Sequence, residues 1–443
     1  MKNSIGLRRE DISRYERRVP LIPAHVKELI REHDLTFYVQ PSSIRVFPDS
    51  EYLAAGAIVQ EDICPSKIVL AIKEIPISKL EPGKAYVFFS HTIKGQPHNM
   101  PMLKKILDLG STLIDYEKMT DEQGRRVLFF GNYAGHAGLV DSLWAYGQRM
   151  KLLGVRTPFL KLRQAINYSN LTELKEDVKQ IGKEIETKGL PAEIGPFICG
   201  FFGYGHVSQG AQEIYDLLPA VEVSASELAE TVEKGYYSLH RVYKVVFKEE
   251  DMVRPKGDFP FDLEDYYRQP EKYYPVTETY LPYLNVLINA IFWTPRYPKF
   301  VTRAFLEKLY AGETQPRLQV IGDITCDING SIECTVRATD SERPVYVFDP
   351  VSGQTIDGFE GRGPVVMAVY NLPAELPLES STYFSQRLKA YVPNLAEADF
   401  QQPFEKIKLD PVVKRAVIAY RGELTPDYKY LAEYLKDIKS ENS

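Results

Sequence analysis

The sequence of 443 residues is poor in cysteine, in tryptophan and in long apolar runs. Its four cysteines are scattered and form no CxxC pair, which argues against a disulfide framework and against a zinc site. No segment approaches the roughly 18 consecutive apolar residues of a transmembrane helix. The formal net charge is −6, so the chain lacks the positive field that attracts nucleic acid or an anionic membrane. An anionic substrate would therefore need a local basic site.

The composition that remains is typical of a globular protein, with 44% apolar and 26% charged residues. At roughly 150 residues per domain, the length predicts two or three domains. The first eighteen residues are charged and have no apolar segment, which predicts a cytoplasmic protein. Much of the tyrosine lies between residues 250 and 300. This segment is either a packed irregular loop or an insertion that faces a substrate.

Residues 1–135 alternate between strand and helix patterns. Strands are expected at residues 5–7, 35–39, 67–72, 85–89 and 111–116, and helices at residues 24–33 and 101–109. This alternation predicts a mostly parallel sheet with helices on its faces. A longer helix at residues 135–153 could bridge two domains, and a helix at residues 380–391 would return the chain to the first domain.

The most informative local pattern is a glycine-rich turn. A buried-strand pattern at residues 197–202 leads into Gly203-Tyr-Gly205-His-Val-Ser208, and helical spacing follows. This context is typical of a dinucleotide-binding fingerprint, in which the backbone and the helix start approach a pyrophosphate. Gly203 would allow the tight turn, and the small Ser208 would let the helix pack on the strand. A plain strand-to-helix turn is the alternative.

The next strand is expected near residues 221–223, and its end bears on the choice of cofactor. In NAD-binding domains an acid about 20 residues after the first glycine grips the ribose. Glu222 lies inside the expected strand and Ser224 near its end, so no acid falls at the tip. The pattern favours NADPH, whose 2′-phosphate an acid would repel, and leaves NADH as the other candidate. Further strands at residues 317–324 and 365–369 would extend this sheet.

Six segments, taken in order, resemble the lysine–ketoglutarate reductase domain of the aminoadipic semialdehyde synthases of plants and animals. They are LRREDISRYERRVPLIP, AYVFFSHTIKGQPHNM, LIDYEKMTDEQGRRVLFFGNYAGHAGLVD, FGYGHVSQGAQEIYDLLP, IGDITCDINGSIE and NLPAELP. The wider superfamily joins alanine dehydrogenase, the lysine-forming saccharopine dehydrogenase and the nucleotide-binding subunit of transhydrogenase. The resemblance implies an α/β protein of two Rossmann-like, doubly wound domains with the active site in the interdomain cleft. Residues 1–155 and 378–443 would form a discontinuous substrate domain, and residues 156–377 a dinucleotide-binding domain.

The resemblance also implies a reaction of lysine degradation. The ε-amine of lysine joins the keto carbon of 2-oxoglutarate, water leaves to give an imine, and NADPH reduces the imine to saccharopine. The proton transfers need an acid/base pair, and Lys73 and His91 match the pair of the superfamily. Both also follow candidate strands directly, at the carboxyl ends where open α/β sheets place ligands. Without the resemblance, the sequence favours a structural role for His91, as a hydrogen-bonded histidine at a strand end.

Binding of the substrates is implied for a further set of charged residues. A dicarboxylate calls for cations, preferably a guanidinium fork, and Arg18 matches the carboxylate-binding arginine of the superfamily. Lys94 and Arg125 match basic residues of the same site. Glu117 matches an acid of the saccharopine dehydrogenase site, where it would face the amino group of lysine. Glu74 is a second acid, and it is shared with the lysine-forming fungal enzymes rather than with the animal or plant reductases.

In the dinucleotide-binding domain, Asp327 matches an acid near the nicotinamide ribose of alanine dehydrogenase, and Asn371 and Leu372 match the loop over the nicotinamide. The predicted cofactor residues are Gly203, Gly205, His206, Val207, Ser208, Ser224, Asp327, Asn371 and Leu372. The expected partners are the small molecules lysine, 2-oxoglutarate and saccharopine. No metal, nucleic acid or membrane is expected, and a homo-oligomer is possible.

Three alternatives to the NADPH-dependent reductase remain. Glu74 favours an NAD-linked, lysine-forming saccharopine dehydrogenase. The superfamily also allows an amino acid dehydrogenase similar to alanine dehydrogenase. The third alternative is a non-catalytic dinucleotide-binding subunit, as in transhydrogenase, against which the presence of Lys73 and His91 argues.

Overall fold

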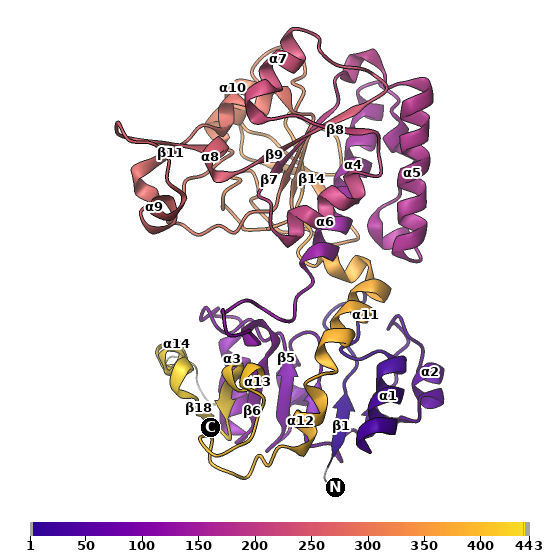
Figure 1. The fold of residues 1–443 in the computed structure, drawn as a ribbon, viewed down its shortest axis with the longest axis vertical. Coiled ribbons are helices and arrows are strands. Elements are labelled where there is room, and N and C mark those ends of the chain that lie inside the picture. Colours follow the sequence, from indigo (N-terminus) through magenta and orange to yellow (C-terminus); the bar gives the residue numbers. More distant parts are fainter. Residues whose placement is uncertain (1–2, 437, 439–443) are drawn as a thin grey trace. The chain divides into compact units, whose positions relative to one another are not determined.

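The computed structural model describes residues 3–436 and residue 438. It divides the chain into two compact units (Figure 1). Unit 1 consists of Met1–Phe130 and Pro377–Ser443, and unit 2 consists of Gly131–Leu376. Each unit has its own sheet of eight strands. The first unit is therefore discontinuous in sequence, and the second is an insertion within it.

The first boundary falls earlier than residue 155. The helix expected at residues 135–153 is α4 (Gly131–Leu152), which belongs to unit 2. It crosses α6 (His206–Tyr215) so closely that a Cβ atom on Gly135 would lie 2.0 Å from the carbonyl oxygen of Val207. Because α4 is buried on most of its circumference, it is a core helix of the second unit. The return to unit 1 falls after residue 376, one residue before the expected position.

The sheet of unit 1 is parallel except at one edge. Its parallel strands are β1 (Ser4–Leu7), β2 (Thr36–Val39), β3 (Ile58–Val59), β4 (Ile68–Leu70), β5 (Ala85–Phe88) and β6 (Thr112–Asp115). A hairpin of β17 (Val417–Tyr420) and β18 (Glu423–Leu424) adds to β6 in the antiparallel sense. The order across the sheet is β18-β17-β6-β5-β4-β1-β2-β3. The strands expected from the apolar runs are all present.

Helices from both ends of the chain cover this sheet. They are α1 (Pro23–His33), α2 (Asp49–Ala54), α3 (Met100–Asp108), α11 (Pro377–Leu388), α12 (Val392–Glu397), α13 (Pro411–Arg415) and α14 (Ala432–Leu435). Two buried serines of α11 bind the N-terminal segment. Ser381 accepts a hydrogen bond from the N–H of Val19 at 3.0 Å, and Ser385 accepts one from the N–H of Ile22 at 2.9 Å. These bonds, together with the buried Phe384, join the returning chain to the first core.

The sheet of unit 2 has six parallel strands and an antiparallel edge. The parallel strands are β7 (Ile198–Phe202), β8 (Ala220–Glu222), β9 (Val242–Phe247), β12 (Val286–Asn289), β13 (Val320–Asp323) and β16 (Val365–Met367), and the edge consists of β14 (Val345–Phe348) and β15 (Thr355–Asp357). The order is β15-β14-β16-β13-β12-β7-β9-β8. The strand expected at residues 221–223 is thus an edge strand, and β9 lies beside β7 in its place.

Both faces of this second sheet are covered (Figure 1). Helices α4, α6 and α5 (Leu171–Lys188) contribute to the buried cluster on one face. Four short helices contribute to the other cluster, and they are α7 (Leu228–Glu233), α8 (Glu249–Met252), α9 (Leu263–Arg268) and α10 (Arg303–Leu309). Each buried leucine in such a cluster stabilises the fold by roughly 1.5–3 kcal/mol. The unit is therefore doubly wound, as predicted.

The tyrosine-rich segment is a packed part of unit 2. It forms α9 and a two-stranded ribbon of β10 (Val253–Pro255) and β11 (Tyr273–Pro275). The rings of Tyr266 and Tyr273 are buried and meet edge to face at 5.3 Å. The buried aromatic residues of this segment thus extend the cluster that covers one face of the sheet. No helix among the described residues has the length and apolar character needed to cross a membrane.

Candidate functional site

Lys73, Glu74 and His91 lie where β4 and β5 end in unit 1. Lys73 and Glu74 follow β4, and His91 follows β5, its neighbour in the sheet. The Nδ1 atom of His91 lies 2.5 Å from Oε1 of Glu74. Burial by itself raises the pKa of Glu74, but the hydrogen bond and the charge of His91 outweigh this effect and lower the pKa. The structure therefore brings together three of the predicted site residues.

The backbone of His91 has an unusual conformation. Its φ angle is 49°, in the left-handed region that non-glycine residues seldom adopt. The side-chain amide of Asn99 donates a hydrogen bond to the carbonyl oxygen of His91 at 3.2 Å, and the ring of Phe89 stacks near the imidazole. Conformations of this kind cost free energy and cluster at functional sites. The loop after β5 thus holds the imidazole beside Glu74.

Lys73 has the properties of a base with an accessible neutral form. Burial lowers its pKa, and the charge of Arg18 adds to this effect against the opposing carboxylates. Its backbone N–H donates to Oε2 of Glu10 at 3.1 Å, while the N–H of Ile72 donates to Oε1 of the same carboxylate at 2.6 Å. Burial raises the pKa of Glu10 to about 8. Glu10, which was not predicted, therefore fixes the chain at the end of β4.

Arg18 is buried and already paired with a carboxylate. Its Nε and Nη2 atoms donate to the two oxygens of Glu16 at 2.8 and 2.6 Å, and its guanidinium lies over the ring of Phe130 at 4.4 Å. Both side chains of the pair are almost fully buried. A substrate carboxylate would have to share this guanidinium with Glu16, a residue that was not predicted.

Glu117 lies beyond the end of β6 and is held by neighbours. Its N–H donates to Oδ1 of Asp115 at 2.8 Å, and its carboxylate forms an ion pair with Arg126. Asp115 is fully buried and also accepts a hydrogen bond from the N–H of Ser90 at 3.2 Å. Burial raises the pKa of Asp115 to about 6. Asp115 therefore joins the loop that carries His91 to the loop that carries Glu117.

Two predicted cations lie apart from this group of contacts. Arg125 is 76% exposed, and its Nε atom donates to Asp121 at 2.8 Å within the same turn. The neighbouring Arg126, rather than Arg125, contacts Glu117. Lys94 is exposed in the loop after β5, where its N–H donates to the side chain of Gln96.

In unit 2 the glycine turn has the geometry of a phosphate-binding turn. Gly203 has a φ angle of 89°, and a Cβ atom there would lie 2.9 Å from the side chain of Ile291. Gly205 immediately precedes α6, and a Cβ atom there would meet nothing within 4 Å. The exposed His206 and the half-buried Val207 begin the helix, and the buried Ser208 packs inward. The space around Gly205 at the start of α6 is open, which is what binding of a pyrophosphate at this helix start would require.

Ser224 lies at the end of the edge strand and serves as a helix cap. Its hydroxyl bonds to the carboxylate of Glu227 at 2.7 Å, and it accepts from the N–H of the same residue, in a capping box that begins the turn Ala225–Glu227. In the structure, β9 lies between this strand and β7. The hydroxyl of Ser224 is therefore already engaged in local structure.

Asp327, Asn371 and Leu372 follow the carboxyl ends of parallel strands. Asp327 lies in a turn after β13, in which Cys326 and Asn329 both have left-handed backbone angles. Asn371 precedes the short helix η10 (Leu372–Glu375), in which Leu372 is buried. Since β7, β13 and β16 are parallel, these residues lie on the same edge of the sheet as the glycine turn.

A pair of buried carboxyl groups lies beneath this last loop. Asp141 of α4 and Glu375 of η10 are both buried and lie close enough for their charges to interact. Burial raises the pKa of Asp141 to about 6, and burial together with repulsion from Asp141 raises that of Glu375 well above its usual range. Two acids in contact can share one proton. The pair joins the loop of Asn371 and Leu372 to the core helix α4.

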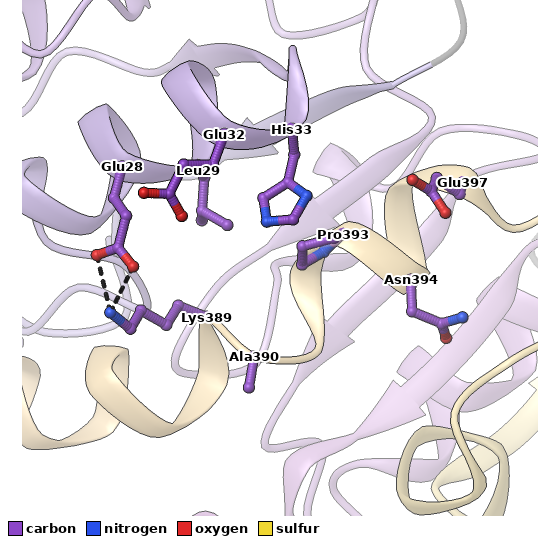
Figure 2. Close-up of a pocket in the computed structure, with 9 residues that line it drawn as sticks. All are labelled: Glu28, Leu29, Glu32, His33, Lys389, Ala390, Pro393, Asn394 and Glu397. Carbon is purple, nitrogen blue, oxygen red and sulfur yellow. Dashed lines mark hydrogen bonds and ion pairs between the residues drawn. The ribbon is translucent and has the colours of Figure 1, made fainter.

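A surface pocket of about 470 Å³ lies elsewhere in unit 1, among residues of α1 and of the segment 389–397 (Figure 2). The Nζ atom of Lys389 lies 2.8 Å from both carboxylate oxygens of Glu28 there. None of the predicted site residues lines this pocket. No group of three or more potential ligands to a metal ion occurs among the residues that the structure describes.

The two units and their sheet-edge residues define an α/β protein with a dinucleotide-binding fold. Family comparison agrees with this class. The model described as alanine dehydrogenase/PNT, N-terminal domain, matches residues 6–137, and the model for the C-terminal domain matches residues 272–427. The chain belongs to the alanine dehydrogenase/PNT family.

Curated relatives refine this assignment. The chain is 40% identical to the mitochondrial alpha-aminoadipic semialdehyde synthase of Bos taurus, over 97% of this chain and 48% of the relative. It is also 40% identical to the synthase of Arabidopsis thaliana, over 99% of this chain and 42% of the relative. A saccharopine dehydrogenase [NAD(+), L-lysine-forming] of Neurospora crassa is 28% identical, over 86% of this chain and 88% of the relative. The chain thus spans about half the length of the synthases that it matches, and the predicted resemblance is confirmed.

Solved structures confirm the predicted fold. An L-alanine dehydrogenase superposes with a TM-score of 0.62 at 17% identity, covering 98% of this chain and 99% of the other. A transhydrogenase from Sinorhizobium meliloti superposes with a TM-score of 0.54 at 15% identity, covering 96% of this chain and 100% of the other. At these identities the likeness concerns the fold alone.

Proposed function

We propose that the chain is an oxidoreductase acting on a CH–NH bond, which condenses L-lysine with 2-oxoglutarate and reduces the resulting imine to saccharopine. The observation that carries this proposal is the group of Lys73, Glu74 and His91 at the end of β4 and β5. The names of the relatives, semialdehyde synthase and saccharopine dehydrogenase, supply the substrate class.

Each member of this group has a role that its surroundings support. The neutral amine of Lys73, favoured by burial, would accept a proton when the substrate amine attacks the keto carbon. With Nδ1 of His91 turned to Glu74, the Nε2 atom would deliver a proton to the departing hydroxyl. The carboxylate of Glu74 would stabilise the imidazolium and keep its orientation.

The substrate carboxylates and the cofactor would be held by separate residues. Arg18 is the strongest candidate for a carboxylate, because its planar fork suits bidentate binding. The glycine turn after β7 would hold the pyrophosphate, and the bound nicotinamide would supply the hydride to the imine carbon. The prediction of NADPH depended on the missing acid at the end of β8. Since β8 is an edge strand, this preference remains a prediction for direct measurement.

Consumption of reduced cofactor tests the proposal. The purified chain should oxidise NADPH or NADH only when L-lysine and 2-oxoglutarate are both present, and mass spectrometry should identify saccharopine. Omitting either substrate is the control. Turnover with pyruvate and ammonia in their place would instead indicate an alanine dehydrogenase.

The glutamate at position 74, as in the lysine-forming fungal enzymes, favours a second candidate, an NAD-linked, lysine-forming saccharopine dehydrogenase. In that direction the hydride of saccharopine goes to NAD⁺, and the imidazole of His91, oriented by Glu74, would accept a proton from the water that adds to the imine. The Neurospora crassa relative carries this name and matches the chain over most of its own length. The ratio of kcat/KM for saccharopine with NAD⁺ to that with NADP⁺ separates the candidates.

A further inference from the structure

The order of strands in unit 2 changes which residues lie next to the glycine turn. Along the chain β8 follows β7, but in the sheet β7 pairs with β9 and β12, and β8 pairs with β9. In dinucleotide-binding sheets the adenosine ribose lies at the carboxyl end of the strand beside the glycine-turn strand. In this protein that strand is β9, which ends at Phe247.

Three hydrogen bonds join the tip of β9 to the glycine turn and its surroundings. The N–H of Gly203 donates to the carbonyl oxygen of Phe247 at 3.2 Å. The hydroxyl of Tyr204, between the two glycines, donates to Oε2 of Glu249 at 3.1 Å. The hydroxyl of Tyr267 donates to the other oxygen of the same carboxylate at 2.5 Å. The carboxylate of Glu249 is therefore fixed next to the turn.

The side chains of Asp251 and Ser224 are held by local hydrogen bonds instead. The carboxylate of Asp251 accepts from the backbone N–H of Lys248 at 2.9 Å, so it is turned toward the chain. The hydroxyl of Ser224 is held in its capping box with Glu227. Lys248 is exposed and directly precedes Glu249 in the sequence, and its charge is of the opposite sign to that of the carboxylate.

We infer that Glu249, in place of Ser224, is the residue that distinguishes the 2′ position of the adenosine ribose. Its carboxylate accepts hydrogen bonds from ribose hydroxyls and repels a 2′-phosphate. The inference rests on the part of the proposed function in which the glycine turn binds a dinucleotide. It adds a specificity-determining residue that the spacing of the motif does not indicate.

Binding of nucleotide fragments tests this inference without the chemical step. ADP-ribose and 2′-phospho-ADP-ribose are titrated by calorimetry into the full chain, its Glu249→Gln variant and its Ser224→Ala variant. Glu249→Gln keeps the size of the side chain and a hydrogen-bond acceptor for one tyrosine. It should raise the affinity for the 2′-phosphorylated probe relative to ADP-ribose by about ten-fold, since one like charge is removed. Ser224→Ala is the control and should leave this ratio unchanged.

The reverse pattern, a changed ratio in Ser224→Ala and none in Glu249→Gln, would overturn the inference. Failure of the wild-type chain to bind either probe would overturn it together with the glycine-turn site. A changed ratio in Glu249→Gln, in a chain that does not turn over lysine and 2-oxoglutarate, would support the inference and contradict the proposed reaction.

Discussion

At the scale of single residues, Lys73 is the side chain whose loss should reduce activity most. Lys73→Met removes the base from the end of β4 and keeps the length of the side chain. It should lower kcat by about 10²- to 10⁴-fold. Dinucleotide binding should persist, because the glycine turn belongs to unit 2. Steady-state kinetics and a fluorescence titration measure the two effects.

The matched control for this prediction is Lys67→Met, which replaces an exposed lysine directly before the same strand. It should leave kcat unchanged. Equal turnover in the Lys73→Met variant and the wild-type chain would contradict the assignment of Lys73 as a base.

Residues such as Lys73 and His91 could be predicted because they directly follow apolar strands, where ligands gather in α/β sheets. Glu10 and Asp115 could not be found in this way. Their partners are backbone N–H groups from distant segments, as in the bond of Glu10 to Ile72. A buried carboxylate that binds backbone groups has no local sequence pattern, so the residues that position Lys73 and His91 emerge only from the fold.

At the scale of elements, Asp115 connects the ends of β5 and β6. Asp115→Asn keeps one oxygen but turns an N–H₂ group toward backbone donors, which should destabilise the fold by about 1–3 kcal/mol. Asp108→Asn on α3 is the matched control. Asp108 forms a surface ion pair with Lys104, so its loss should cost about 0–1 kcal/mol. Denaturant unfolding measures both values, and equal losses would contradict the role of Asp115.

The carboxyl pair between α4 and η10 predicts a dependence of stability on pH. The pKa of Asp141 is raised to about 6 by burial, and that of Glu375 is raised further. Groups with a raised pKa in the folded state contribute their full stability below the usual carboxyl pKa of about 4. This contribution is lost as the pH rises through 6 and above.

The free energy of unfolding should therefore decrease from pH 5 to pH 8, and Glu375→Gln should reduce the slope because it removes one titrating group of the pair. Glu10, with a pKa raised to about 8, contributes a slope of the same sign. The difference in slope between the Glu375→Gln variant and the wild-type chain gives the contribution of the Asp141–Glu375 pair alone. Identical slopes in urea unfolding at a series of pH values would show that the pair does not titrate.

Elements themselves were more predictable than their order. Apolar runs located five strands of the first sheet and β7, β8, β13 and β16 of the second, since periodicity reports burial. The strands β9, β12 and β14 were not predicted. The position of β9 between β7 and β8 could not be predicted, because pairing order depends on how the connections pack rather than on any single strand. This is why Ser224 was expected near the ribose, whereas the structure places the tip of β9 beside the glycine turn.

At the scale of the whole molecule, the inserted unit should fold alone. Unit 2 has its own sheet and a buried cluster on each face. A chain of residues 131–376 should unfold cooperatively and bind ADP-ribose, while a chain of residues 156–377 should not fold, because it lacks α4. Circular dichroism and calorimetry test both. A folded chain without α4 would contradict the assignment of this helix to the second core.

The discontinuous architecture was anticipated from the resemblance, but the boundary at residue 131 was not. The apolar residues of α4 are compatible with either core in the sequence, and the close contacts of Gly135 with α6 and of Gly138 with Ile324 identify its partner. The chain is acidic overall, yet unit 1 holds a local group of cations. The buried Arg18 and the half-buried Lys73 lie there among Glu10, Glu16 and Glu74.

The most direct test of the proposed reaction is the dependence of cofactor oxidation on both substrates. The purified chain is given NADPH or NADH with L-lysine, with 2-oxoglutarate, and with both. We expect oxidation only in the complete mixture, one saccharopine formed for each cofactor oxidised, and loss of this activity in Lys73→Met. Oxidation with one substrate alone, or equal turnover in the variant, would contradict the proposed reaction.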